Sequence, residues 1–228
     1  MVFCPGFKSD MEGAKATAVA DWAKRRGQAC LRFDYRGHGS SDGRFEDGTI
    51  GQWFEDTLGA FDALTDGPQI VVGSSMGGWM GLLLARARPD RVAAFVGIAA
   101  APDFTEDLMW DRMPPELRAR LERDGVIEQA SEYGQDPYTI TRALIEDGRK
   151  HLLLRAPLGY EGRVRLLQGM QDKDVPWQWS LKIAERLATA DVQVLLVKDG
   201  DHRLSRKTDI ALLTQTLDAL MRPTPAAP

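Results

Sequence analysis

One serine of the chain lies in a pattern that can present a nucleophile. Ser75 lies in the segment Gly-Ser-Ser-Met-Gly at 73–77, directly after the apolar run 69–72 and before a run of helical character at 79–88. A serine in a sharp turn from strand to helix exposes its hydroxyl, and the glycines let the two elements approach where a Cβ would clash. This pattern predicts a nucleophilic serine, with an ordinary Gly-Ser turn as the alternative.

A serine hydroxyl needs a base to take its proton, and a histidine oriented by a carboxylate is a common arrangement. The chain has three histidines. His202 follows the apolar run 192–197, so we predict it as the general base, against the alternative of a surface-loop histidine without a role. His38 precedes Ser75 in a glycine-rich loop, and His151 lies in an irregular region, which disfavours both as the base.

The carboxylate that would orient this histidine has several candidates. Asp172 comes where the chain leaves the strand expected at 164–167, so it can face His202. Asp174 is the nearby alternative, with a solvated loop carboxylate as its simpler interpretation. Asp103, at the end of an earlier strand, is a third candidate.

Acyl transfer also needs two backbone donors for the oxyanion, each worth about 3 kcal/mol of barrier. Met76 follows the serine at the start of a helix, so its N–H can point at a developing negative charge. The segment Pro5-Gly6-Phe7 permits a tight turn that presents the Phe7 N–H. An ordinary Pro-Gly turn is the alternative.

Bulk properties exclude some classes of protein. The 228 residues are 43% apolar, and a net charge of -4 argues against a nucleic-acid partner. The two cysteines lie in apolar runs and do not form a disulfide framework. No apolar run reaches membrane-spanning length, and no signal peptide is recognisable, so we expect a cytoplasmic protein. No clustered ligand set resembles a zinc site, and we expect neither a metal nor an organic cofactor.

Apolar, β-rich runs alternate with segments of helical period along most of the chain. Such alternation predicts an α/β fold, with a mostly parallel, doubly wound sheet. The expected strands are 1–4, 29–33, 69–72, 92–99, 164–167 and 192–197. The expected helices are 11–26, 49–64, 79–88, 177–188 and 208–221.

This rhythm breaks in one block, where the sequence becomes irregular and helix-rich. We interpret 101–161 as a helical cap inserted between two strands, with 1–100 and 162–222 forming the core and 223–228 a frayed tail.

Apolar residues recur near helical spacing inside the cap. They are Met109, Trp110, Met113, Leu117 and Leu121. Such a stripe commonly packs a helix onto a core, and the same stripe could line an acyl pocket. Met109, Trp110 and Met113 are therefore the candidate substrate-binding residues.

Four segments of this chain carry a resemblance to the α/β-hydrolase superfamily. Segment 32–43 resembles the family's Asp-x-Arg-Gly-x-Gly-x-Ser loop, and 73–78 resembles its nucleophile elbow. Segment 169–176 resembles its acid loop, and Asp201-His202 its histidine loop. The resemblance spans nearly the whole chain and implies the α/β-hydrolase fold, with serine, acid and histidine in that order.

Within this superfamily the chain is most similar to the abhydrolase-domain group of palmitoyl-protein thioesterases and acyl-glucuronide esterases. Five runs carry this likeness: 5–7, 30–35, 66–70, 73–79 and 201–203. Many relatives have His-Gly in the oxyanion loop, whereas this chain has the Pro-Gly of the thioesterase group.

The resemblance implies a serine esterase or thioesterase with Ser75, Asp172 and His202 as catalytic triad. The implied substrates are small acyl esters or thioesters, or an acylated protein, and no cofactor is needed. Fold alone does not fix the substrate. C–C bond hydrolysis on the same triad and a non-catalytic binding module therefore remain alternatives, and the oligomeric state is open.

Overall fold

A single parallel sheet forms the centre of the molecule. The computed structural model describes residues 1–129 and 137–222, so the tail expected to fray lies outside the described residues. Neighbouring strands all pair in parallel, in the order β2-β1-β3-β4-β7-β8. The strands are β1 (Val2–Cys4), β2 (Leu31–Arg32), β3 (Gln69–Ser74), β4 (Val92–Ile98), β7 (Arg163–Gly169) and β8 (Val192–Val197).

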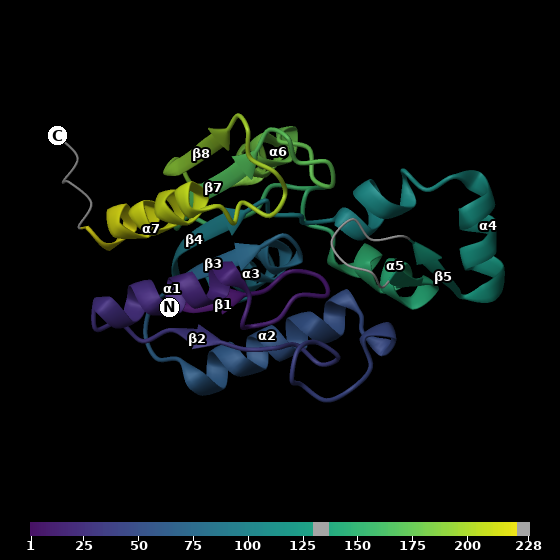
Figure 1. Cartoon of the computed structure of the whole chain (residues 1–228), viewed down its shortest axis with the longest axis horizontal. Helices are drawn as coiled ribbons and strands as arrows, with labels where there is room; N and C mark the ends of the chain where they lie inside the picture. Colours follow the sequence, from purple (N-terminus) through teal and green to yellow (C-terminus); the bar gives the residue numbers. More distant parts are fainter. Residues whose placement is uncertain (130–136, 223–228) are drawn as a thin grey trace.

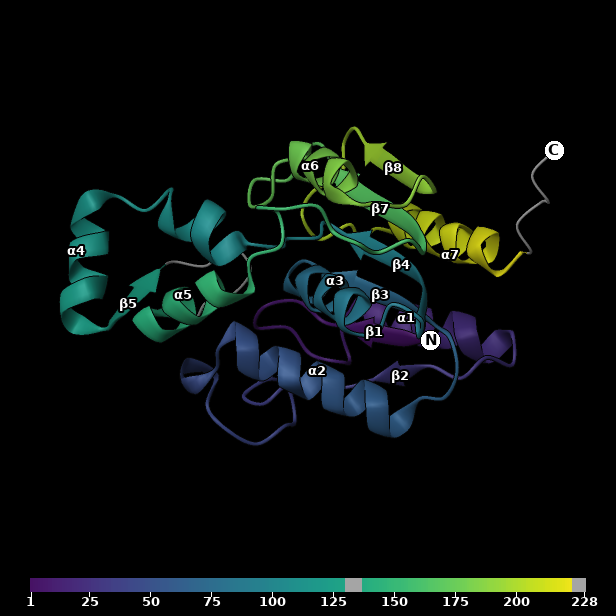
Figure 2. The same ribbon diagram turned by 180° about the vertical axis from the view of Figure 1, so that it is seen from behind.

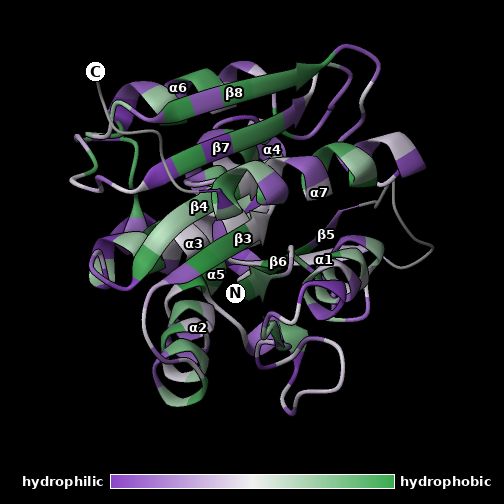
Figure 3. Cartoon of the chain, turned by 90° about the vertical axis from the view of Figure 1, so that its left-hand side faces the viewer, coloured by the Kyte–Doolittle hydropathy of each residue, from purple (hydrophilic) through white to green (hydrophobic). Residues whose placement is uncertain are grey.

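Helices cover both faces of this sheet. They are α1 (Ala14–Arg25), α2 (Ile50–Leu64), α3 (Met76–Ala87), α6 (Gln178–Arg186) and α7 (Lys207–Met221). α1 and α7 lie on the face seen in Figure 1, and α2, α3 and α6 on the face seen in Figure 2. Figure 3 shows the hydrophobic strands β3 and β4 between these two layers. The predicted doubly wound architecture is confirmed.

Local sequence signals explain where several helices begin and end. The Thr49 hydroxyl accepts a hydrogen bond from the Gln52 N–H (3.4 Å) and caps α2. Gly27, with φ of +65°, follows the end of α1 in the left-handed conformation that glycine adopts without strain. α3 is buried from Met76 to Ala85, because it lies against the sheet and packs on α2.

The chain leaves the sheet between β4 and β7. This excursion contains the π-helix η2 (Thr105–Trp110), α4 (Pro115–Asp124), β5 (Val126–Gln129), β6 (Tyr138–Thr141) and α5 (Arg142–Gly148). It stands beyond the carboxyl ends of the strands (Figure 1) and covers the block that the sequence analysis interpreted as a cap. The division into core and cap as domains stays a prediction. β5 and β6 form an antiparallel pair that the sequence analysis did not predict.

The excursion has a small hydrophobic core of its own. Its buried members are Met113, Leu121, Ile127, Ile140 and Ile145, and Met109, Trp110 and Leu117 pack against them. The apolar stripe expected in this region therefore serves mainly to hold the excursion together.

Candidate active site

The nucleophile candidate sits in a strained turn between β3 and α3. Ser75 has φ of 53°, a value that is uncommon for residues other than glycine. Its N–H donates to the Ile98 carbonyl (2.9 Å), and its carbonyl accepts from the Ala101 N–H (3.1 Å). The end of β4 thus holds the backbone conformation that presents the hydroxyl.

The glycines of this turn are required by close backbone contacts. A Cβ on Gly73 would lie 2.2 Å from the Gly77 carbonyl oxygen, and a Cβ on Gly77 would lie 2.0 Å from the Cys4 carbonyl oxygen. Both distances are too short for real contacts, and both partners are backbone atoms that side-chain rotation cannot move.

We expect the substitution Gly77→Ala to lower the free energy of unfolding by about 3 kcal/mol or more, because β1 and α3 would have to separate. Gly59→Ala is the matched control: Gly59 lies in α2, and a Cβ added there would meet no atom within 4 Å. It should stabilise the protein by about 0.5–1 kcal/mol. Urea denaturation measures both, and equal effects of the two substitutions would contradict the close-contact argument.

The three predicted catalytic side chains lie together at the carboxyl ends of the strands. The His202 Nε2 atom is 3.1 Å from the Ser75 Oγ, and its Nδ1 atom is 2.8 Å from the Asp172 Oδ2. The Asp172 side chain has no exposed surface. A proton on Nδ1 donates to the carboxylate, which leaves Nε2 as the acceptor for the serine hydroxyl.

Both carboxylate oxygens of Asp172 are engaged on several sides. Oδ1 accepts the N–H groups of Asp174 and Val175, both at 2.9 Å. Oδ2 accepts from His202 and also from the Gln168 Nε2 (2.8 Å). Sequence reasoning missed Gln168, whose only signal is its position as the residue before Gly169 at the end of β7.

The two other acids that the sequence offered, Asp174 and Asp103, have different surroundings. Asp174, an exposed residue, brings a carboxylate oxygen within 4.8 Å of the ligand atoms of Asp172 and His202, close enough in principle for a metal ion. An ion bound there would displace hydrogen bonds that Asp172 already accepts, which argues against a metal site. The expectation that the protein needs no metal stays a prediction. Asp103 is buried and accepts the N–H groups of Leu153 (2.7 Å) and Leu154 (2.9 Å), which ties the start of the excursion to its end.

The predicted oxyanion donors flank the serine. A Cβ on Gly6 would lie 3.4 Å from the Ser75 Cβ, so the loop after β1 passes directly beside the nucleophile. Within the described part of the chain, neither the Phe7 N–H nor the Met76 N–H donates a hydrogen bond. Both donors therefore remain available for an oxyanion.

The loop after β1 is supported by the glycine-rich loop 32–43. The Lys8 N–H donates to the His38 Nε2 (3.2 Å), and the Tyr35 hydroxyl donates to the Pro5 carbonyl (3.0 Å). His38 is buried, and its Nδ1 lies 3.3 Å from the Arg36 carbonyl. The sequence identified this loop by resemblance alone, and the structure shows that it supports the loop after β1.

Burial lowers the pKa of His38, although the Arg36 carbonyl and the carboxylates of Asp34 and Asp56 oppose this effect. The unfolded chain therefore binds the proton more tightly, and stability falls as pH drops below about 6.5 towards the lowered pKa. We expect His38→Gln, which keeps an acceptor that does not titrate, to lose less stability than the wild type between pH 7.5 and 5. Thermal unfolding measures the difference, and identical pH dependences would exclude His38 as the cause.

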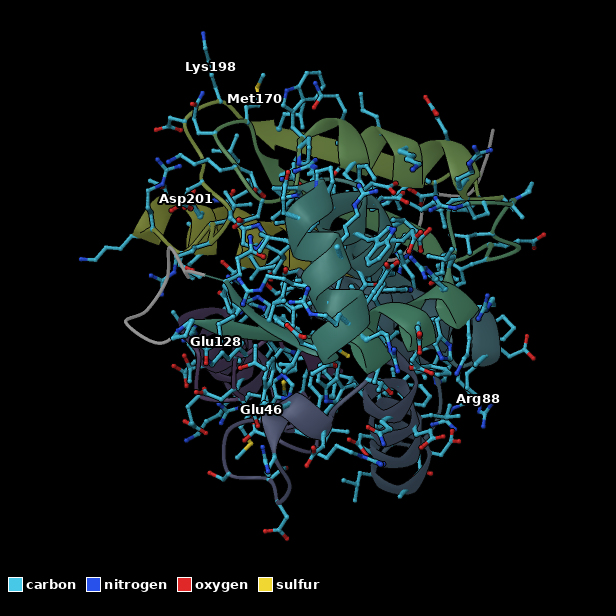
Figure 4. The ribbon with its side chains drawn as sticks, turned by 90° about the vertical axis from the view of Figure 1, so that its right-hand side faces the viewer. Glu46, Arg88, Glu128, Met170, Lys198 and Asp201 are labelled. Atoms are coloured by element: carbon cyan, nitrogen blue, oxygen red, sulfur yellow. The ribbon has the colours of Figure 1, made fainter. Side chains whose placement is uncertain are left out.

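Other groups hold the histidine loop. The Lys15 ammonium, on α1, donates to the Arg203 carbonyl next to His202, and burial lowers the pKa of Lys15 to about 8. The Asp201 carboxylate accepts the Leu204 N–H (2.9 Å). Figure 4, seen from the side of the excursion, shows Asp201 at the periphery of the molecule. His151, the remaining histidine, lies 3.6 Å from Asp147, on the excursion.

A cavity of about 670 Å³ opens onto Ser75 and His202. Its apolar wall comes from Phe7, Phe104, Leu108, Met109, Met113, Leu117 and Ile140. Met109 and Met113 thus line the cavity, and their role in substrate binding stays a prediction. Among the described residues, Trp110 does not line this cavity. Its ring packs against the guanidinium groups of Arg118 (5.4 Å) and Arg149 (4.8 Å).

This fold, with a serine in a strand-to-helix turn beside a histidine and a buried aspartate, defines an α/β-hydrolase. Residues 1–227 match the model of the alpha/beta hydrolase family, and the chain belongs to that family. It is 44% identical over 222 residues to the human protein named palmitoyl-protein thioesterase ABHD10, mitochondrial, a match that covers 97% of this chain and 72% of the relative.

Solved structures agree. Mouse alpha/beta hydrolase domain-containing protein 10 superposes with a TM-score of 0.90 at 43% identity, covering 96% of this chain and 88% of that one. A putative hydrolase from Agrobacterium vitis superposes with a TM-score of 0.93 at 44% identity, covering 97% and 87%. The expected fold and the expected enzyme class, an ester or thioester hydrolase, are confirmed.

The expected cytoplasmic location is wrong. The human, bovine and orangutan relatives are all named as mitochondrial proteins, which contradicts that expectation. The expectation rested on sequence patterns that do not separate the cytosol from the interior of an organelle. Among the described residues, no helix is long and apolar enough to cross a membrane.

Proposed function

We propose that the chain hydrolyses acyl thioesters through an acyl-enzyme on Ser75, with His202 as general base and Asp172 as the acid that orients it. The observation that carries this proposal is the continuous contact from the Ser75 Oγ through the imidazole to the Asp172 carboxylate, at 3.1 and 2.8 Å. The relatives named as palmitoyl-protein thioesterases support thioesters, including acylated protein, as the substrate class.

The chemistry proceeds in two halves. The Ser75 Oγ attacks the acyl carbon as Nε2 of His202 takes its proton, and the Phe7 and Met76 N–H groups receive the negative charge on the carbonyl oxygen. The thiolate leaves with that proton, and the acyl group stays on Ser75. Water, deprotonated by the same Nε2, then attacks the ester, and that proton passes from His202 to the departing Ser75 Oγ as the carboxylic acid is released.

The cavity is suited to an acyl chain. Its volume of about 670 Å³ falls within the usual range for small-molecule sites. Met109 and Met113 contribute flexible, polarisable side chains that adapt to different chain shapes. We therefore propose these two residues, but not Trp110, as contacts for the acyl group.

A fluorophosphonate probe and a substrate panel test this proposal. The probe should label the wild type and Ser74→Ala, which keeps the reactive hydroxyl, but not Ser75→Ala, and peptide mapping should place the label on Ser75. Acyl thioesters of graded chain length, with p-nitrophenyl esters for comparison, should be hydrolysed. A folded protein that takes no label would favour a binding module, and labelling without ester or thioester turnover would favour another reaction of the triad, such as C–C hydrolysis.

A further inference from the structure

We infer that Gln168 is a positioning residue for the catalytic acid, and that Ser180 orients Gln168 in turn. This inference rests on the proposed function, since it assigns a role relative to Asp172 and His202. Gln168 is the penultimate residue of β7 and has no exposed surface, while Ser180 lies on α6 and is 1% exposed. Neither side chain lines the cavity within the described part of the chain, so neither is expected to touch the substrate.

The Gln168 amide connects the acid to the backbone of its own loop. Its Nε2 atom donates to the Asp172 Oδ2 (2.8 Å) and to the Val175 carbonyl (3.1 Å). The Val175 N–H in turn donates to the Asp172 Oδ1 (2.9 Å). One amide thus fixes both the carboxylate and the turn that supplies the carboxylate's other donors.

The orientation of this amide is determined by its partners. The Ser180 hydroxyl donates to the Gln168 Oε1 (3.2 Å), whereas Nε2 faces three acceptors, the third being the Gly169 carbonyl (3.4 Å). A flipped amide would place its oxygen against the Asp172 carboxylate and the Val175 carbonyl, and buried oxygen atoms facing one another without a proton are costly. The buried chain Ser180–Gln168–Asp172–His202 therefore has one consistent set of donors and acceptors.

Gln168 affects catalysis by restricting the rotation of the Asp172 carboxylate. Asp172 Oδ2 accepts from both Gln168 and the His202 Nδ1, each at 2.8 Å, so the glutamine limits the rotation of the carboxylate that aligns the imidazole. Small misplacements of a catalytic group can cost up to about 100-fold in rate. The substrate does not contact Gln168, so loss of the amide should lower kcat and leave KM unchanged.

Two substitutions of Gln168 separate positioning from packing. Gln168→Leu keeps a similar volume and removes both donor hydrogens, so we expect kcat to fall about 10–100-fold with KM within about twofold. Gln168→Glu can still donate when protonated, because two carboxyl groups at this separation share one proton. At low pH, kcat relative to wild type should be higher for Gln168→Glu than for Gln168→Leu. As the pH rises, the value for Gln168→Glu should fall to that of Gln168→Leu.

Ser180→Ala tests the second part of the inference, and Thr216→Val is the control variant. Ser180→Ala should lower kcat, but less than Gln168→Leu does, since the acceptors that face Nε2 still favour the same amide orientation. Thr216 is a buried residue on α7 whose hydroxyl donates to the Leu212 carbonyl (2.8 Å), away from the triad. Thr216→Val tests whether the loss of any buried hydrogen bond affects turnover, and we expect kcat to remain at the wild-type value in the folded variant.

The melting temperature and the turnover of every variant are measured between pH 6 and 9. The turnover assays are run well below the lowest melting temperature, so that every variant is folded. A fall in kcat for Gln168→Leu with a pH-dependent advantage of Gln168→Glu supports the inference. The inference is overturned if Gln168→Leu keeps kcat within twofold of wild type, or if both Gln168 variants lose equal activity at every pH. An active Ser75→Ala would instead remove the proposed function itself, so the two failures are distinguishable.

Discussion

Replacing Ser75 with alanine is expected to lower kcat for acyl-thioester hydrolysis about a million-fold, the scale found when a serine-protease nucleophile is removed. The reason is that the substitution removes the proposed nucleophile, the Ser75 Oγ, which lies 3.1 Å from the His202 Nε2. The residual rate comes from substrate binding and from the Phe7 and Met76 donors, which the substitution leaves in place. Release of free thiol, followed with a chromogenic thiol reagent, measures this loss.

Two further variants make the test specific. His202→Ala should lose a comparable amount, and the double variant Ser75→Ala/His202→Ala should lose little more, because the two groups act as a unit. His151→Ala is the matched histidine control, since that residue lies beside Asp147 on the excursion and should keep turnover near wild type. Additive losses in the double variant would show that serine and histidine act independently, contrary to the proposed relay.

The sequence predicted the central sheet, and it led to three candidate catalytic residues that lie together in the structure, because both depend on local signals. Chain order, together with the rule that catalytic loops follow the carboxyl ends of strands, led to Ser75, Asp172 and His202. The pairing of β1 with β3, Val2 opposite Val71 and Cys4 opposite Gly73, then brings the oxyanion loop beside the elbow. Parallel strands that end at one edge of a sheet bring distant segments together, so a correct strand order suffices for this part of the site.

Features that depend on side-chain packing between distant segments could not be predicted in the same way. Trp110 continues the apolar stripe of the excursion, but its ring packs against two arginine side chains, Arg118 on α4 and Arg149 directly after α5. The pair of β5 and β6 was missed although Val126, Ile127 and Ile140 are β-branched, because each strand has four residues and eight residues separate the two strands. Short runs of this kind give too weak a pattern to distinguish strand from helix.

The residues that support the site could not be predicted from the sequence either. Gln168 precedes a glycine at the end of an apolar strand, and its sequence neighbourhood gives no indication that it contacts Asp172 and Ser180. Likewise, His38 is remote from Phe7 along the chain, yet its ring accepts the N–H of Lys8. Such residues become visible only when each buried polar atom is matched to its partner.

Asp172→Asn is expected to lower kcat about 1,000- to 10,000-fold without unfolding the protein. The backbone N–H groups of Asp174 and Val175 will keep the amide oxygen at the position of Oδ1, so the NH2 group must occupy the position of Oδ2. There it faces donors from His202 and Gln168. The imidazole can relieve this conflict only by moving its proton from Nδ1 to Nε2, and in that tautomer it cannot accept the proton of Ser75.

The comparison variants are the two acids that sequence reasoning left open. Asp174→Asn should cost less than about tenfold, because its backbone N–H rather than its carboxylate holds Asp172. Asp103→Asn should lower the free energy of unfolding by about 1–3 kcal/mol, since an amide cannot accept both the Leu153 and Leu154 N–H groups as the carboxylate does. Its kcat should change little. Turnover near wild type in Asp172→Asn, with a large loss in Asp174→Asn or Asp103→Asn, would transfer the role of the orienting acid to that residue.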